Sequence, residues 1–290
     1  MYIAGVDIGG TSIKFGVVDD NYEFVYSEMF PPVQGDPQAT VQRIVKAMRE
    51  CPVPVMRIGV GTAGLVDTKD HHVTAVNLGW ERAPIKQLLQ DATGIRTWVD
   101  NDAQAALAAE WKNGTLMGCK TGILLTLGTG VGGALLIDGK PWRGEKNDAS
   151  ELGHIVTHAG GKKCPCGSRG CFEQYASATA LSELGGGRSA KEIVDLARAG
   201  DPAMAAVFEK YLNELAAGIA GLFWIFQPEK VSLGGGVSRA GDFLLDGTRR
   251  VLREEYGQKN AERVCLARHQ NNAGMLGAAA LAEYHTYQRT

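Results

Sequence analysis

Short apolar runs alternate with amphipathic stretches along the chain, and glycine or proline separates many of them. The β-rich runs at residues 2–8 and 13–18 predict two strands joined by a glycine turn. Asp36 followed by Pro37 is typical of a helix start, and apolar residues then recur at helical spacing. Strands that alternate with helices indicate an α/β fold. Other expected elements are strands over residues 57–61 and 97–99 and helices over residues 85–91 and 103–112.

The opening pattern recurs near the middle of the chain. An apolar run at residues 122–127 leads into the glycine-rich segment 128–133 and then into the apolar segment 134–137. Two such units suggest a diverged internal duplication, and 290 residues are enough for two lobes. The expected boundaries are 1–115 for a smaller N-terminal lobe, 275–290 for a C-terminal helix that completes it, and 116–274 for a larger C-terminal lobe.

Charge and composition exclude several classes of protein. Lys and Arg number 30 against 32 Asp and Glu, so we expect no nucleic-acid partner and no anionic membrane surface. The apolar run at residues 215–226 is shorter than the ~20 residues of a membrane span and contains Gly218 and Gly221, so it predicts a buried helix. The first residues lack the pattern of a signal peptide, and we therefore expect a cytoplasmic protein.

Glycine supplies 38 of the 290 residues and gathers in a few runs. A glycine turn lets backbone N–H groups approach phosphate oxygens closely, and Thr11 or Thr129 adds a hydroxyl donor. Asp7, at the end of the first strand, is suited to hold hydrated Mg²⁺ beside a triphosphate. Each turn alone could be a tight hairpin, but two of them, and a third run after a later strand, favour phosphate binding. The predicted phosphate-binding residues are Asp7, Gly9, Gly10, Thr11, Lys14, Thr129, Gly130, Gly132, Gly133, Gly234, Gly235 and Gly236.

Asn101 and Asp102 end one predicted strand and open the helix that follows. Either side chain could serve as a helix cap. A kinase that acts on an alcohol needs a carboxylate within hydrogen-bond reach of the attacking hydroxyl. In a phosphate-binding α/β protein, Asp102 is therefore the candidate general base.

Three cysteines lie within eight residues, close after a histidine. Cys164, Cys166 and Cys171 with His154 are enough for a closed tetrahedral Zn²⁺ site, and His158 is a rival fourth ligand. Four protein ligands leave no open position, so the zinc is expected to be structural. We expect it to order the loop at 154–173, with the phosphate-binding glycine turns at a distance. The flanking Glu151 and Glu173 are either sugar contacts or solvated surface residues.

These motifs together resemble the ROK group of bacterial sugar kinases and repressors, within the actin-like/hexokinase (ribonuclease H-like) ATPase fold. The resemblance covers nearly the whole chain, from Asp7-Ile-Gly-Gly-Thr11 to Ala273-Gly274, and the histidine–cysteine segment is its most specific part. It implies two α/β lobes with an interlobe cleft, Asp102 as the catalytic base, and His154 rather than His158 as the zinc ligand. The residues that it implies as sugar contacts are Asn77, Asn101, Asp102, Glu151, His154 and Glu173.

The resemblance further implies a glycolytic enzyme that phosphorylates a hexose with ATP, most simply glucose to glucose 6-phosphate. Glu151 matches members that act on glucose, whereas Gln104 resembles N-acetylmannosamine kinases. Kinases of fructose, mannose or N-acetylglucosamine are further alternatives. A repressor would carry a winged helix-turn-helix before the first glycine turn, and an actin-like ATPase would not need the sugar contacts. Asn272 stands where many relatives have Asp. We expect ATP, Mg²⁺ and structural Zn²⁺ as cofactors, a hexose substrate and a homodimer.

Overall fold

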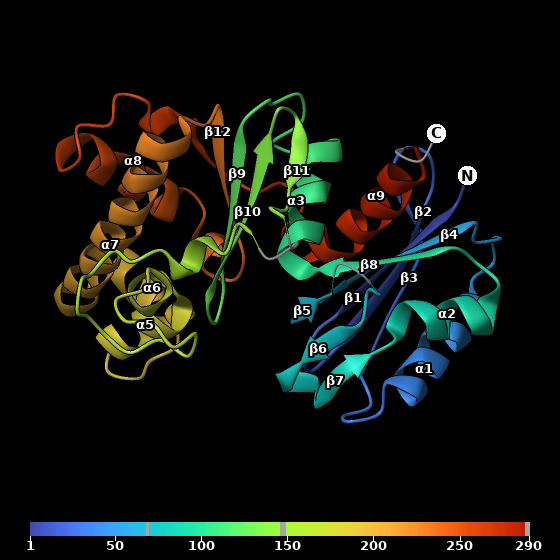
Figure 1. Cartoon of the computed structure of the whole chain (residues 1–290). Coiled ribbons are helices and arrows are strands. Elements are labelled where there is room, and N and C mark those ends of the chain that lie inside the picture. Colours follow the sequence, from blue (N-terminus) through green and yellow to red (C-terminus); the bar gives the residue numbers. More distant parts are fainter. Residues whose placement is uncertain (68–69, 146–148, 288–290) are drawn as a thin grey trace. The chain divides into compact units, whose positions relative to one another are not determined.

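The computed structural model describes residues 1–67, 70–145 and 149–287, which form two compact units (Figure 1). Unit 1 comprises Met1–Met117, Arg143–Ala149 and Asn271–Thr290. Unit 2 comprises Gly118–Trp142 and Ser150–Gln270. The chain thus passes from unit 1 into unit 2, returns to unit 1 twice, and ends there. The last three positions of the helix expected over 275–290 lie outside the described residues.

Unit 1 is built on a five-stranded sheet. The second strand along the chain is antiparallel to the first, and the third is antiparallel to the second, whereas β4 (Arg57–Thr62) and β8 (Thr97–Asn101) run parallel to the first. The strand order is β3 (Phe24–Phe30), β2 (Ile13–Val18), β1 (Ile3–Ile8), β4 (Arg57–Thr62) and β8 (Thr97–Asn101). A small antiparallel sheet adds β5 (Leu65–Val66), β6 (Val73–Ala75) and β7 (Trp80–Ala83), with the 3₁₀ turn η1 (Val76–Leu78) between the last two.

Helices cover both faces of this sheet (Figure 1). On one face lie α1 (Pro37–Glu50) and α2 (Ile85–Thr93), and on the other lie α3 (Asp102–Asn113) and α9 (Ala273–Tyr287). Successive side chains of a strand point to opposite faces, so Ala4 and Val6 enter the apolar core that α1 shares, and Gly5 lies under α9. A Cβ on Gly5 would lie 1.9 Å from the Met275 carbonyl oxygen. Glycine therefore lets the backbone of α9 rest on the sheet.

The predicted start of α1 is confirmed. The Asp36 side chain accepts a hydrogen bond from the Ala39 N–H at 2.8 Å, and Pro37 occupies the first helical turn. This cap satisfies one of the backbone N–H groups that a helix start leaves without an internal partner. The helix then buries Val41, Ile44 and other apolar residues against the sheet.

Unit 2 repeats the sheet of unit 1. Its order is β11 (Lys140–Trp142), β10 (Val131–Ile137), β9 (Gly122–Leu127), β12 (Lys230–Gly234) and β13 (Val264–Leu266). The first three strands along the chain are antiparallel, and the last two continue parallel to the first, as in unit 1. Equal order and equal strand directions support the internal duplication inferred from the two glycine turns.

The helices of unit 2 form its apolar core with the sheet. Helix α7 (Pro202–Phe226) contains the predicted buried helix, and Tyr211, Leu215, Ile219 and Leu222 are fully buried along it. Trp224, near the end of α7, is instead 75% exposed, so burial ends before the helix does. The described residues contain no helix that is both long and apolar enough to span a bilayer. The helices are α4 (Glu173–Ala176), α5 (Ala178–Leu184), α6 (Ala190–Arg198), α7 (Pro202–Phe226) and α8 (Asp242–Glu254).

Candidate active site and metal cluster

The first glycine turn, residues 9–12, joins β1 to β2 in unit 1. The Gly9 N–H donates to the Ser12 carbonyl at 2.9 Å and closes the turn, and Thr11 is exposed at its tip. A Cβ on Gly10 would lie 2.9 Å from Nδ2 of Asn77, which is exposed in η1. The structure therefore places a predicted sugar contact against a predicted phosphate turn.

Asp7 lies just before this turn and is surrounded by groups that suit a phosphate site. Lys14 Nζ donates to Asp7 Oδ2 at 3.1 Å and to the Asn271 carbonyl at 3.2 Å. A Cβ on Gly274 would lie 2.4 Å from Cγ of Asp7, so the first turn of α9 packs directly against the carboxylate. The Asp7 side chain keeps 19% of its surface exposed, and its hard oxygen atoms fit Mg²⁺.

The structure separates the roles of the adjacent Asn101 and Asp102. The Asn101 side chain accepts from the Ala103 N–H at 2.8 Å and donates to the Gly64 carbonyl at 3.2 Å, so Asn101 is the cap of α3. Asp102 is the first residue of α3 and is exposed. Since Asn101 caps the helix, the cap does not account for the Asp102 carboxylate.

A buried ion pair, which the sequence did not predict, supports the backbone where β8 ends and α3 begins. Asp100 is 3% exposed, and its carboxylate accepts from Arg143 Nη1 and, at 2.9 Å, from the Asn101 N–H. Arg143 belongs to unit 1 but follows the first three strands of unit 2 along the chain. No local pattern links residues so far apart in the sequence. The pair neutralises a buried carboxylate two positions before Asp102 and holds the backbone there.

The second glycine turn, residues 128–130, joins β9 to β10 in unit 2 and is shorter than predicted. Gly132 and Gly133 lie within β10, where they pair with Thr126 and Leu125. A Cβ on Gly133 would lie 2.5 Å from Cβ of Leu152, so this glycine is needed for packing. Only residues 128–130 form an irregular turn.

Glu173 lies directly on the second glycine turn. Its Oε2 accepts from the Val131 N–H at 3.0 Å, and a Cβ on Gly130 would lie 2.1 Å from the same oxygen. Because Glu173 follows the cysteine segment, the expectation that the zinc loop and the phosphate turns lie far apart is wrong for this turn. The contact joins residues 42 positions apart and left no signal in the sequence.

The third glycine run, residues 234–236, continues from β12 and approaches the same region of unit 2. Gly235 has φ of +84°, and a Cβ there would lie 2.5 Å from the Leu127 backbone nitrogen. Glycine is thus required both by the backbone conformation and by the approach to the end of β9. Ser238 Oγ donates to the Gly235 carbonyl at 2.7 Å and fixes the turn.

His154, Cys164, Cys166 and Cys171 form one cluster, with a donor atom of each within 4.8 Å of those of the others. His154 Nδ1 lies 3.6 Å from Cys164 Sγ, and Cys166 Sγ lies 3.6 Å from Cys171 Sγ. His158 lies apart from it, because its ring stacks on Tyr175 and its Nε2 lies 3.4 Å from Glu214. Three sulfurs and one imidazole fit the preference of zinc, and the geometry selects His154 over His158.

The thiols of the cluster differ in acidity. The backbone N–H of Ser168 and the neighbouring thiols hold the pKa of Cys166 below its ordinary value. Burial, together with the two other thiols, raises the pKa of Cys171 to about 12. Metal ligation requires thiolates, so a cation bound in the cluster would displace the proton of Cys171.

The two residues that bear on sugar choice differ in exposure. Glu151 is exposed and immediately precedes the 3₁₀ turn η2 (Leu152–His154), next to the cluster. Gln104 is 5% exposed within α3. Only Glu151 is therefore accessible at the surface of its unit.

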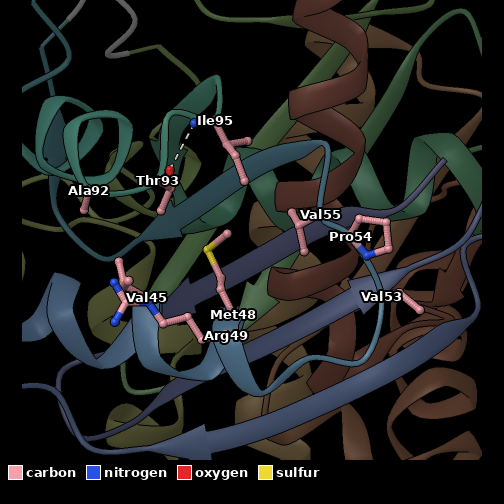
Figure 2. A pocket seen from close by; sticks show the side chains of 9 residues that line it. All are labelled: Val45, Met48, Arg49, Val53, Pro54, Val55, Ala92, Thr93 and Ile95. Atoms are coloured by element: carbon pink, nitrogen blue, oxygen red, sulfur yellow. Dashed lines mark hydrogen bonds between the residues drawn. The ribbon is translucent and has the colours of Figure 1, made fainter.

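A separate hollow of about 270 Å³ lies at the other edge of the unit 1 sheet (Figure 2). It is bounded by the end of α1, the segment before β4 and the segment before β8, whereas Asn101 and Asp102 follow the opposite end of β8. The length of β8 therefore separates the hollow from Asp102. Its lining residues are Val45, Met48, Arg49, Val53, Pro54, Val55, Ala92, Thr93 and Ile95.

The repeated five-stranded sheets, each with a glycine turn between its first two strands, define the actin-like class of α/β proteins, as predicted. The chain belongs to the ROK family, which it matches over residues 3–285. It is 35% identical to the glucokinase of Streptomyces coelicolor over 306 aligned residues, 96% of each chain.

Two solved structures have the same fold over nearly their full length. The ROK hexokinase from Thermus thermophilus has a TM-score of 0.85 and 33% identity, with 99% of this chain and 100% of that chain covered. The ROK family glucokinase from Streptomyces griseus, in complex with glucose and AMPPNP, has a TM-score of 0.82 and 34% identity. That comparison covers 98% of this chain and 100% of that chain.

Proposed function

We propose that this protein is an ATP-dependent hexose kinase that converts glucose to glucose 6-phosphate. The likeness to a glucokinase in complex with glucose and an ATP analogue supports both substrates. The observation that carries the chemistry is the exposed carboxylate of Asp102 at the start of α3, where Asn101 already provides the cap. An exposed carboxylate in the first turn of a helix that another residue caps can reach a substrate.

In the proposed reaction, the carboxylate of Asp102 accepts the proton of the sugar 6-hydroxyl while that oxygen attacks the γ-phosphorus of ATP. The bond between the γ-phosphorus and the bridging oxygen breaks, and ADP leaves with the electron pair. Backbone N–H groups of the glycine turns bind the phosphates. Mg²⁺, held by Asp7 through water, would neutralise part of the triphosphate charge.

Six residues are proposed to bind the sugar, because each carries a side chain that can exchange hydrogen bonds with hydroxyls. Asn77 and Asn101 offer amides, and Asp102, Glu151 and Glu173 offer carboxylates. His154 is proposed both to contact the sugar and to hold a structural zinc ion with Cys164, Cys166 and Cys171. The zinc would fix the loop that presents His154 and would take no part in the chemistry, since four protein ligands fill its coordination sphere.

N-acetylmannosamine is the second candidate substrate, on account of Gln104. Because Gln104 is buried in α3 and Glu151 is exposed, Glu151 is the better indicator of the substrate. We therefore expect glucose to be preferred.

The test is ADP formation from ATP with glucose, mannose, fructose, glucosamine, N-acetylglucosamine and N-acetylmannosamine. Glucose should give the highest kcat/KM of the six sugars. A tenfold preference for N-acetylmannosamine would instead make Gln104 the correct indicator, and the absence of sugar-dependent ADP formation would refute the kinase proposal.

A further inference from the structure

Four of the six backbone hydrogen-bonding groups of the second glycine turn, residues 128–130, are engaged within unit 2. Inside the turn, the Gly128 N–H donates to the Gly130 carbonyl at 2.9 Å. The remaining contacts come from the segment that follows the cysteines. The Ala178 N–H donates to the Gly128 carbonyl at 2.8 Å, and Thr179 Oγ1 donates to the Thr129 carbonyl at 2.7 Å.

Two N–H groups of the turn, those of Thr129 and Gly130, have no hydrogen-bond partner among the described residues. Their direction follows from the planarity of the trans peptide, in which the carbonyl and the N–H point to opposite sides. The chain contains no cis peptide among the described residues. Since the carbonyls of Gly128 and Thr129 point toward Ala178 and Thr179, the two N–H groups point away from them. Two adjacent N–H groups with one common direction can bind an anion.

We propose that Thr179 is a positioning residue for this nucleotide-phosphate turn. Its hydroxyl holds the Thr129 carbonyl and thereby sets the direction of the Gly130 N–H across the same peptide plane. This inference rests on the proposed function, because it assigns the N–H groups of Thr129 and Gly130 to a phosphate of ATP. In this proposal Thr179 acts through the Thr129 carbonyl and not as a ligand contact of its own.

The support beneath Thr179 is rigid enough for this purpose. Ser177 caps α5 by accepting from the Ala180 N–H at 3.1 Å. Just before it, the Ala176 carbonyl accepts from the hydroxyl of the fully buried Tyr211 at 2.8 Å. Phe172 is also fully buried and packs so closely on α7 that a Cβ on Gly218 would lie 2.3 Å from its ring. The start of α5 is thus fixed to the core of unit 2.

The first test compares Thr179→Val with Thr179→Ser by titrating Mg²⁺ and AMPPNP into each protein. Valine keeps the shape but lacks the hydroxyl, so we expect binding to weaken by about 3- to 10-fold, the scale of one intramolecular hydrogen bond. Serine keeps the hydroxyl and should bind within twofold of the wild type. Glucose affinity and zinc content should be unchanged in both variants.

Thr93→Val is the matched control. Thr93 Oγ1 makes the same kind of bond, to the Leu89 carbonyl at 2.6 Å, but it lies in unit 1 at the end of α2. Its loss should leave nucleotide affinity unchanged. A loss of affinity in Thr93→Val equal to that in Thr179→Val would overturn the assignment.

Ala178→Pro tests the same turn independently, because proline removes the N–H that holds the Gly128 carbonyl. Ala178 is the first residue of α5, where proline is tolerated, and Ser177 before it has the extended conformation that proline requires (φ -84°, ψ 168°). We expect weaker AMPPNP binding with α5 intact. If the wild type binds AMPPNP and neither Thr179→Val nor Ala178→Pro weakens it, the inference is wrong. If the wild type does not bind AMPPNP, the proposed function itself fails.

Discussion

Gly59→Ala provides a stringent test of how α9 lies on the unit 1 sheet. The added methyl carbon would be 1.8 Å from the Ala278 carbonyl oxygen and 2.4 Å from its carbonyl carbon. Real contacts of this kind are essentially never shorter than 3.0 Å, so the helix must move by about 3.0 − 1.8 = 1.2 Å. It cannot move freely, because on its other side Gly277 packs against the backbone of Ala105 in α3.

Overpacking of this kind costs about 1–3 kcal/mol, and the rigid backbone on both sides places Gly59→Ala at the upper end, about 3 kcal/mol. The melting temperature should then fall by about 6–12 °C. Displacement of α9 would also move Gly274 away from Asp7, so kcat/KM should fall as well.

Gly221→Ala in α7 is the matched control. A Cβ there meets nothing within 4 Å, so the higher helix propensity of alanine should raise stability by up to about 1 kcal/mol. Thermal and urea unfolding of both variants, followed by circular dichroism, decides the question. An unchanged melting temperature in Gly59→Ala would show that α9 does not rest on β4 as described.

Two further substitutions test the candidate site. Asp102→Asn should lower kcat at least ~10²-fold, which is the scale of losing a general base. Glucose affinity should stay nearly intact, since the amide keeps the shape of the side chain but cannot accept the proton. A kcat near that of the wild type would exclude Asp102 as the base. Cys166→Ser should remove zinc, measured by metal analysis, and should raise the KM for glucose strongly. AMPPNP binding should change much less, because Phe172 and Tyr211 still hold the segment that supports the second glycine turn. Zinc-free wild type with unaltered glucose affinity would contradict this second expectation.

Local sequence patterns predicted the elements well but could not assign neighbouring polar residues. The helix expected over 103–112 is α3, and the cap and proline that begin α1 are confirmed. Spacing alone could not decide whether Asn101 or Asp102 caps α3, because both residue types are good caps. The backbone settles it, since only the Asn101 side chain accepts from the Ala103 N–H.

Contacts between distant segments were beyond the reach of the sequence. Arg143 and Asp100 pair across 43 positions, and Glu173 and Val131 across 42. A strand or a helix shows a pattern of apolar residues that repeats within a few positions. A contact between two distant residues leaves no such repeating pattern and forms only when the sheets are assembled. The length of the second glycine turn was misjudged for the same reason, because Gly133 is explained by the packing of Leu152 from a later segment.

The placement of α9 has a consequence for the order in which the protein is made. Helix α9, which rests on β1 and β4, begins only at residue 273, so residues 1–117 leave the ribosome without it. At ~5–20 residues per second, about 150 more residues take roughly 8–30 s to be added. During that time α9 is missing from the face of β1 and β4 on which it rests, and α3 is the helix already present on that face. Unit 2 therefore has all of its segments once residue 270 has been added. Unit 1 is translated first, but it is complete only when α9 has been added.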